Sequence, residues 1–318
     1  MRRVALIYNP VSGQHSKRRA AILPDALAAL HGAGIETEVL ETNGPGSAGA
    51  CAQEAIRRGC DTILALGGDG TVHEVMQCLV GTDVALGVVP MGTANALAHN
   101  LGLGSRAASA IRALLTAEPM AVRVGRIFYR DSAGAECSRY FTVAAGIGLD
   151  AMLMSRQNSA LKRRFGYALY VLDGFMVWAT RPFPLFRAEF QSDGGGAPRV
   201  EEVSEVMTVR IRTFGGLLGT FLPGASLHND RLRMAVFKTR SRMRYFRFLM
   251  ALLAGRHTFS NQIELVEATT VECRARDGSE PAVYVEADGE VLGTLPARIE
   301  IAPQPLTLTL LVPPNTKP

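Results

Sequence analysis

The feature of this sequence that most constrains its fold is an alternation of short apolar runs and helical patterns over the first 125 or so residues. The apolar runs, which we interpret as buried strands, are Val4–Tyr8, Glu38–Glu41, Thr62–Leu66 and Val84–Val89. Helical spacing of apolar residues occupies a segment that ends near Leu30, and also Ser47–Arg58 and Val72–Val80. This order predicts βαβ units and a mostly parallel sheet, with a ligand at the carboxyl ends of the strands.

After Gly125 the sequence is dominated by strand patterns separated by Gly, Pro and Asp. The strand-like runs are Tyr140–Ala144, Glu205–Thr213, Arg231–Thr239, Gln262–Arg274 and Ala282–Glu286, and helical spacing persists only in Leu161–Trp178 and Ser241–Leu253. We therefore predict two domains. An α/β domain covers residues 1–125 and is completed by a C-terminal strand from about Leu306, within 306–318. An antiparallel, β-rich domain covers residues 126–305.

Composition and charge exclude several classes of protein. Hydrophobic residues make up 47% of the 318 positions, which excludes a disordered chain. The net charge of +5 suits anionic phosphate ligands or an anionic membrane surface, and it is too small to argue for nucleic-acid binding. The five Cys include no CxxC pair, so we expect neither disulfides nor a zinc site. This cysteine content also leads us to expect a cytoplasmic location. The longest apolar stretch, Ala168–Ala179, contains Asp173 and is shorter than the ~20 residues that span a bilayer.

The segment Leu66–Glu74, with the sequence LGGDGTVHE, carries the strongest chemical signal. It follows a predicted strand and opens a predicted helix, so its main-chain N–H groups can converge on a phosphate at the positive helix end. A carboxylate at Asp69 would repel that phosphate unless it acts through Mg²⁺ or the water molecules of Mg²⁺. A tight turn that caps a helix is the alternative interpretation of this loop on its own.

Two further loops follow predicted strands. They are Asn9–Gly13, with the sequence NPVSG, and Pro90–Asn95, with the sequence PMGTAN. A parallel sheet gathers such loops at one edge, where small hydroxyl and amide side chains then line one crevice. The three loops together predict a nucleotide-binding site.

These blocks resemble the diacylglycerol kinase catalytic-domain family, which includes bacterial diacylglycerol kinase-like lipid kinases and sphingosine and ceramide kinases. The resemblance rests on NPVSG, GGDGTVHEV and PMGTANALA in this order, and it extends to Gly146–Ala151, Leu222–Ser226 and Ala287–Glu290. The GGDGT element alone is shared with NAD kinases and phosphofructokinases. The resemblance therefore implies an N-terminal fold like that of NAD kinases and phosphofructokinases.

The resemblance implies an ATP-dependent kinase that transfers the γ-phosphoryl group to a lipid hydroxyl. The nucleotide contacts that it implies are Asn9, Pro10, Val11, Ser12, Gly13, Thr42, Gly67, Gly68, Asp69, Gly70, Thr71, Val72, His73, Glu74, Gly92, Thr93 and Asn95. Glu290 is the expected general base, with Asp288 beside it and Asp69 as a further catalytic residue, because a carboxylate can accept the proton of a poorly nucleophilic hydroxyl. Taken alone, Asp288–Glu290 also fits a hairpin turn between the strands Ala282–Glu286 and Glu290–Thr294.

The sequence departs from the bacterial family pattern where acids are expected, at Asn95-Ala96, at Arg123–Arg126 and at His228–Asp230. The first two departures affect an acidic network around Mg²⁺. The third weakens a structural metal site whose ligands would be Ser226, Asn229 and the main chain of Arg231. We still expect Mg²⁺ to enter with ATP, since the triphosphate supplies most of its ligands.

Basic and bulky apolar residues alternate in two segments. Lys162–Arg164 precedes the apolar stretch Tyr167–Trp178, and four arginines at 240, 242, 244 and 247 are interspersed with Met, Tyr, Phe and Leu. Such segments favour an interfacial helix on anionic phospholipid, and the alternative is a surface helix packed on its own core. We expect a lipid substrate at a membrane surface and a peripheral position at the inner membrane face. The identity of the lipid and a homodimer stay open, as do an NAD kinase-like phosphotransferase and a protein that binds nucleotide or lipid without turnover.

Overall fold

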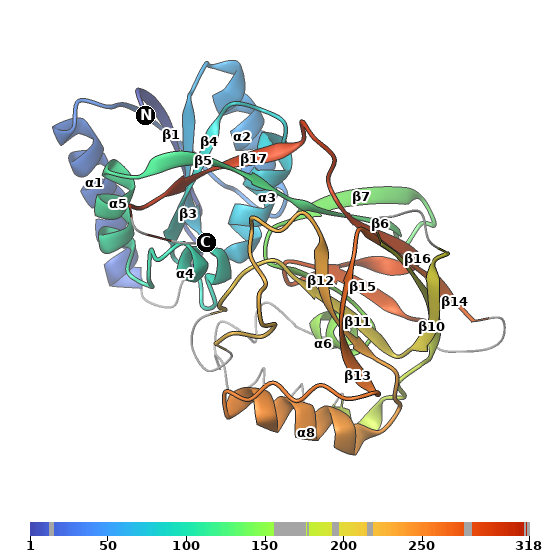
Figure 1. The fold of residues 1–318 in the computed structure, drawn as a ribbon. Coiled ribbons are helices and arrows are strands. Elements are labelled where there is room, and N and C mark those ends of the chain that lie inside the picture. Colours follow the sequence, from blue (N-terminus) through green and yellow to red (C-terminus); the bar gives the residue numbers. More distant parts are fainter. Residues whose placement is uncertain are drawn as a thin grey trace. The chain divides into compact units, whose positions relative to one another are not determined.

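The computed structural model describes residues 1–12, 16–155, 176, 178–192, 197–214, 219–276, 282–314 and 316. Within it the chain forms two compact units (Figure 1). Unit 1 contains Met1–Val124 and Pro303–Pro318, and unit 2 contains Gly125–Ala302.

Unit 1 is an α/β unit with a six-stranded sheet in the order β2-β1-β3-β4-β17-β5. Its strands are β1 (Arg3–Tyr8), β2 (Glu36–Glu41), β3 (Thr62–Gly67), β4 (Ala85–Pro90), β5 (Glu118–Arg123) and β17 (Thr307–Val312). Only the pairing of β17 with β5 is antiparallel, so the mostly parallel sheet predicted from the sequence is confirmed. Every residue of β3 and β4 is buried, as expected of parallel strands covered on both faces.

Five helices of unit 1 lie among the described residues. They are α1 (Ser16–Gly32), α2 (Ser47–Arg57), α3 (Asp69–Leu79), α4 (Ala96–Asn100) and α5 (Ala107–Leu115). Helix α1 packs with α5, and α2 packs with α3, and the two pairs flank the sheet from opposite sides (Figure 1). The sheet is therefore covered, and its carboxyl edge is left to the loops.

Unit 2 is an antiparallel β unit with an eleven-stranded sheet, so the β-rich second part predicted from the sequence is confirmed. Its strands are β6 (Gly125–Arg130), β7 (Glu136–Phe141), β8 (Ala144–Ile147), β9 (Phe186–Gln191), β10 (Arg199–Val203), β11 (Glu205–Val209), β12 (Leu232–Phe237), β13 (Ile263–Ala268), β14 (Thr270–Ala275), β15 (Tyr284–Ala287) and β16 (Glu290–Ile301). One buried cluster that includes Ile127, Phe186 and Ile299 forms its core. The described helices of this unit include α6 (Leu149–Ser155) and α8 (Arg242–Leu253).

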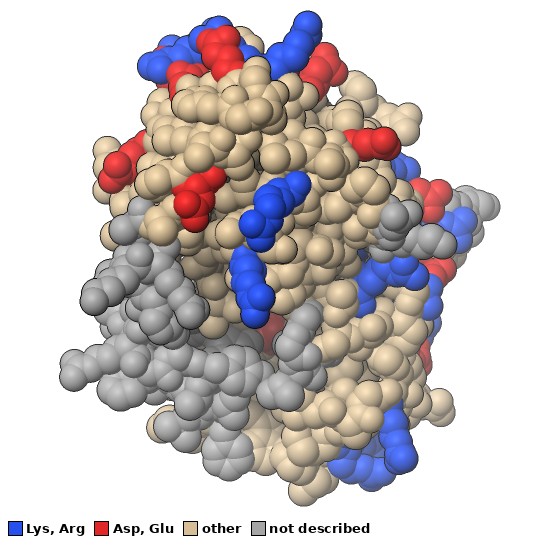
Figure 2. Space-filling view, turned by 90° about the vertical axis from the view of Figure 1, so that its left-hand side faces the viewer, with Lys and Arg blue, Asp and Glu red and all other residues tan. Residues whose placement is uncertain are grey.

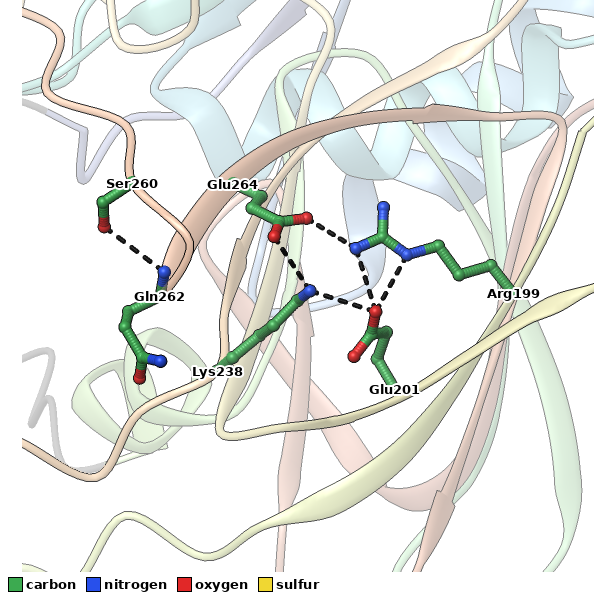
Figure 3. Close-up of polar contacts among 6 residues, drawn as sticks. All are labelled: Arg199, Glu201, Lys238, Ser260, Gln262 and Glu264. Atoms are coloured by element: carbon green, nitrogen blue, oxygen red, sulfur yellow. Dashed lines mark hydrogen bonds and ion pairs between the residues drawn. The ribbon is translucent and has the colours of Figure 1, made fainter.

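Ion pairs join the two ends of the strand order β10-β9-β14-β16-β15-β8-β11-β12-β13 (Figure 3). Arg199 on β10 donates to Glu264 on β13 at 2.6 Å, and to Glu201 at 2.9 Å. Lys238, directly after β12, donates to Glu201 at 3.0 Å and to Glu264 at 2.9 Å. Since β10 and β13 are the end strands, alternating charges bridge a seam of the sheet where β10 and β13, as far as the structure describes them, form no ladder with each other.

Two runs predicted as single strands are divided in the structure. The run Gln262–Arg274 divides at Thr269, whose N–H and hydroxyl both donate to the carbonyl of Gln191, so β13 pairs with β12 while β14 pairs with β9 and β16. The run Tyr140–Ala144 divides between Phe141 and Ala144. Most of the predicted helix Leu161–Trp178 lies outside the described residues. None of the described helices combines the length and hydrophobicity that crossing a membrane requires.

Candidate active site

The loops after β1, β2 and β3 are joined at the carboxyl edge of the parallel sheet. The side-chain amide of Asn9 donates to the hydroxyl of Thr71 at 3.0 Å, and its main-chain N–H donates to the carbonyl of Leu66. The N–H of Thr42, a buried residue, donates to the carbonyl of Tyr8. The structure therefore brings together Asn9, Thr42 and the GGDGT loop, as the parallel arrangement requires.

Glycine is required where the loops after β3 and β4 approach each other. A Cβ atom on Gly92 would lie 2.7 Å from the Cα atom of Gly68, and a Cβ atom on Gly67 would lie 2.5 Å from the Thr71 side chain. Real Cβ atoms essentially never come this close. The two main chains meet with no side chain between them, which leaves main-chain N–H groups at the start of α3 as the surface of the loop.

The hydrogen bonds of Asp69 give a structural reason for an acid in this loop. The Asp69 carboxylate accepts the N–H groups of Asn95 and Ala96, one on each oxygen and both at 2.8 Å. Asn95 has a positive φ of 47°, and its side chain bonds both main-chain polar groups of Gly92 at 2.8 Å. Asp69 thus fixes the start of α4 and the shape of the third loop, and Asn95 closes that loop.

The three residues that follow Thr71 among the predicted nucleotide contacts are buried or hydrogen-bonded within unit 1. Val72 and His73 are buried in α3. The Glu74 carboxylate accepts the N–H groups of Gly46 at 2.8 Å and Ala48 at 3.0 Å, at the first turn of α2. The solvent-exposed and half-buried members of the predicted set are Asn9, Pro10, Val11, Ser12, Gly68, Asp69, Gly70, Glu74, Gly92 and Thr93, while Gly13 lies outside the described residues.

In unit 2, Asp288 and Gly289 form the two-residue turn between β15 and β16, with φ values of 49° and 82°. The Asp288 carboxylate accepts three main-chain N–H groups, from Thr142 at 3.0 Å, Val143 at 2.8 Å and Ala144 at 3.1 Å. These donors lie where β7 ends and β8 begins, which explains why the predicted strand there is divided. The hairpin turn is therefore present, and Glu290 stands exposed as the first residue of β16 beside a firmly held Asp288.

Unit 2 contains three buried acids, Asp150, Glu205 and Glu286, of which Glu286 lies on β15 of this hairpin. Burial raises the pKa of Asp150 to about 7, and burial together with the Asp150 charge raises the pKa of both glutamates well above the ordinary value. Glu286 also accepts the N–H of Gly289 in the turn at 2.9 Å. Glu205 and Glu286 were not among the predicted site residues. No local signal identifies Glu286 as buried, because a Glu between two apolar residues on a strand is the alternation expected of a solvent-facing side chain.

The residues that were predicted to hold a metal make other polar contacts in the structure. A main-chain nitrogen bonds each oxygen of Asp69, and among the described residues there is no group of three or more His, Cys, Asp or Glu side chains that could hold a metal. In the loop from Ser226 to Arg231, the buried guanidinium of Arg210 donates to the carbonyls of Leu227 at 3.0 Å and Asn229 at 3.1 Å. The Asn229 amide donates to the carbonyl of Gly224. Arg210 supplies a cation to this loop, and the structural metal site at Ser226, Asn229 and Arg231 stays a prediction.

The fold and the loops define a class of kinases with an NAD kinase-like second unit, and the comparisons agree. Residues 3–127 match the model of the diacylglycerol kinase catalytic domain, and residues 142–310 match the YegS C-terminal NAD kinase beta sandwich-like domain. The chain belongs to the diacylglycerol kinase catalytic-domain family. It is therefore a phosphotransferase with an alcohol acceptor, and its family implies ATP as a substrate.

Relatives match over most of the chain. The diacylglycerol kinase of Mycobacterium tuberculosis is 27% identical, with 96% of this chain and 94% of that protein covered, and that of Bacillus subtilis is 28% identical, with 93% and 92% covered. A diacylglycerol kinase structure from Bacillus anthracis covers 99% of this chain and 98% of its own, with a TM-score of 0.70 and 22% identity. The structural likeness shows that the fold is shared.

Proposed function

We propose that this chain is an ATP-dependent lipid kinase that transfers the γ-phosphoryl group to a lipid hydroxyl, of diacylglycerol or of a sphingoid or ceramide-type lipid. The observation that carries the proposal is the hairpin at Asp288–Glu290, which presents an exposed carboxylate from a turn held by three main-chain N–H groups. Relatives called diacylglycerol kinase, which match more than 90% of this chain and of their own length, support the choice of acceptor.

In this proposal unit 1 holds the nucleotide. The phosphates lie against the main chain of Gly68 and Gly70 at the start of α3, where N–H groups and the helix dipole favour negative charge. Asn9, Ser12 and Thr93 provide polar side chains at the same edge of the sheet. Asp69 acts as a positioning residue, since its two hydrogen bonds fix the loop that carries Thr93.

Glu290 is the proposed general base. It accepts the proton of the lipid hydroxyl as the oxygen attacks the γ-phosphorus and the bond from that phosphorus to the ADP oxygen breaks. Asp288 keeps the turn in its left-handed conformation and so fixes the first position of β16. Mg²⁺ enters as part of the substrate MgATP, bound mostly by the triphosphate, and it neutralises charge there.

Replacing Glu290 by Gln tests the role of this carboxylate. The Glu290→Gln variant should keep the nucleotide affinity of the wild type, because unit 1 contains the proposed nucleotide contacts, while its rate with lipid falls by about 10²–10⁴-fold. Glu136→Gln is the matched control, since Glu136 is the exposed first residue of a hairpin strand in the same unit. Isothermal titration with nucleotide and transfer of ³²P measure the two quantities. A Glu290→Gln rate equal to that of Glu136→Gln would remove Glu290 from the mechanism.

A panel of acceptors tests the substrate. Diacylglycerol, monoacylglycerol, sphingosine and ceramide in mixed micelles, and NAD in solution, are offered with labelled ATP. The proposal expects label in a lipid. Label in NAD alone would replace the lipid kinase by an NAD kinase-like phosphotransferase, which shares the GGDGT loop.

A further inference from the structure

We propose that the exposed face of α8 docks onto a bilayer that contains anionic phospholipid, an inference that rests on the proposed function because a lipid kinase must reach an acceptor held in a bilayer. Helix α8 carries two apolar faces. One packs inside unit 2 through Tyr245, Phe248 and Leu252, and the Tyr245 ring stacks on that of Phe237 with 4.6 Å between the centroids. The contacts of this first face hold α8 on unit 2, and the second apolar face is not needed for that packing.

The second face is a stripe of large apolar side chains in solvent. Their exposed fractions are 60% for Met243, 40% for Phe246, 43% for Leu249, 40% for Met250 and 42% for Leu253. Residues three, four and seven apart on a helix share one side, so these five form one continuous stripe. They are five of the ten large hydrophobic residues that are exposed among the described residues, and a single exposed apolar residue would be ordinary but a stripe is not.

The charged residues of α8 and of the residues that flank it in the sequence have one sign. Arg240 to His257 contains five Arg and neither Asp nor Glu. In Figure 2, the basic side chains in view at the lower end, the level of α8 in Figure 1, have no acidic side chain beside them. An apolar stripe bordered by arginines is the composition of a helix that lies in the headgroup region of anionic lipid.

The chain's one tryptophan lies beside this surface. The Trp178 ring is 5.9 Å from that of Phe246, and its indole N–H donates to the carbonyl of Arg242 at 3.0 Å. Tryptophan is favoured at membrane interfaces, where its ring is partly in hydrocarbon and its N–H is hydrogen-bonded. Trp178 therefore extends the apolar surface of α8, and its fluorescence can report whether that surface enters a bilayer.

Charge decides between a bilayer and a second copy of the chain as the occupant. A symmetric dimer places the same patch of both copies face to face, so the arginines of α8 would meet arginines. Anionic headgroups complement them instead, while the acyl region takes up the apolar side chains.

Vesicle binding tests the proposal. The whole chain is mixed with vesicles of phosphatidylglycerol and phosphatidylcholine, or of phosphatidylcholine alone. Binding is followed by co-sedimentation and by Trp178 emission, which should shift to the blue and be quenched by brominated acyl chains. We expect strong binding to the anionic vesicles only, and weaker binding at 1 M salt, where the screening length falls to about 3 Å.

Two double variants separate the contributions of the stripe and of the charges. Leu249→Gln/Leu253→Gln should weaken binding by about tenfold or more. Its control is Val39→Gln/Val200→Gln, which changes residues of 39% and 43% exposure on β2 and β10. Arg244→Gln/Arg247→Gln should weaken binding about fivefold for each arginine removed, and Arg57→Gln/Arg112→Gln, on helices of unit 1, should leave it unchanged.

Equal vesicle binding by the stripe variant and its control would overturn the proposal. So would a dimer of the free protein that Leu249→Gln/Leu253→Gln dissociates, since the occupant would then be a second copy. Kinase activity on a short-chain acceptor dispersed in solution keeps the two proposals apart. The Leu249→Gln/Leu253→Gln variant should retain that activity and lose activity on lipid in vesicles. A wild type without activity on either acceptor would contradict the proposed function, and the vesicle-binding result would then decide the docking proposal by itself.

Discussion

The Asp288 carboxylate is a point where one substitution should weaken a large part of unit 2. It accepts three main-chain N–H groups at 2.8–3.1 Å, and it is half-buried. A hydrogen bond to a charged group contributes about 1.5–3 kcal/mol, which sets an upper limit of about 4.5–9 kcal/mol for three. Water can reach part of this turn, so we expect Asp288→Ala to lower the free energy of unfolding by about 3–4 kcal/mol.

Two further substitutions separate the hydrogen bonds from the backbone. Asp288→Asn keeps one acceptor oxygen and tolerates the positive φ of 49°, so it should lose about 1–2 kcal/mol. Asp288→Gly removes the carboxylate and also the strain of a Cβ atom at positive φ, so it should be about 1 kcal/mol more stable than the Ala variant. The expected order of stability is wild type, Asn, Gly, Ala.

Urea unfolding followed by Trp178 emission measures these differences within unit 2, since Trp178 is the chain's one tryptophan. Each change in the midpoint, multiplied by the slope, gives the change in unfolding free energy. A loss below about 1 kcal/mol for Asp288→Ala would refute the reasoning, because an acceptor of three N–H groups cannot be removed at so small a cost. An Asn variant no more stable than the Ala variant would refute the separation of the hydrogen-bond contribution from the backbone contribution.

Four other outcomes are expected. Asp69→Ala should reduce phosphoryl transfer by about 10²-fold or more and weaken nucleotide binding measured by calorimetry, while Asp69→Asn, which keeps one acceptor, falls between it and the wild type. Burial raises the pKa of Glu286 well above 4.5, so its contribution to stability is present below pH 4.5 and is lost as the pH rises. Urea midpoints between pH 5 and pH 8 should therefore fall less in Glu286→Gln than in the wild type, and equal slopes would count against the buried cluster. Lys238→Met should lower the unfolding free energy by about 1–2 kcal/mol at pH 7. The Lys238 ammonium lowers the pKa of Glu201 below 4.5, so this difference should shrink as the pH falls through that range, as acid titration of the midpoint will show. Excess EDTA tests the metal site: because the guanidinium of Arg210 already bonds the carbonyls of this loop, the thermal midpoint of the wild type should stay unchanged, and a lower midpoint would support a metal there.

Local sequence predicted most elements of unit 1, with α4, α5 and β5 as the exceptions, and the places where its loops follow the strands. The apolar run Thr62–Leu66 is a buried strand, and GGDGT opens the helix that begins at Asp69, because period, glycine content and helix-start signals act within a few residues. The helix expected over Ser241–Leu253 is present for the same reason. The resemblance of whole blocks then predicted the family correctly.

Partners far apart in the sequence decided what those residues do, and only the tertiary structure supplies them. Asp69 looked like a ligand of magnesium, yet its acceptor role depends on N–H groups 26 and 27 residues away. Asp288 depends on donors 144–146 residues away, and the same contact divides a strand that apolar pattern alone had predicted as continuous. The residues next to a carboxylate in the sequence do not show whether its side chain contacts a metal, a main-chain N–H group or another acid. Which of these it meets is fixed when the sheets pack, because burial makes an acid without a partner costly and so selects the arrangement in which each one is bonded or protonated.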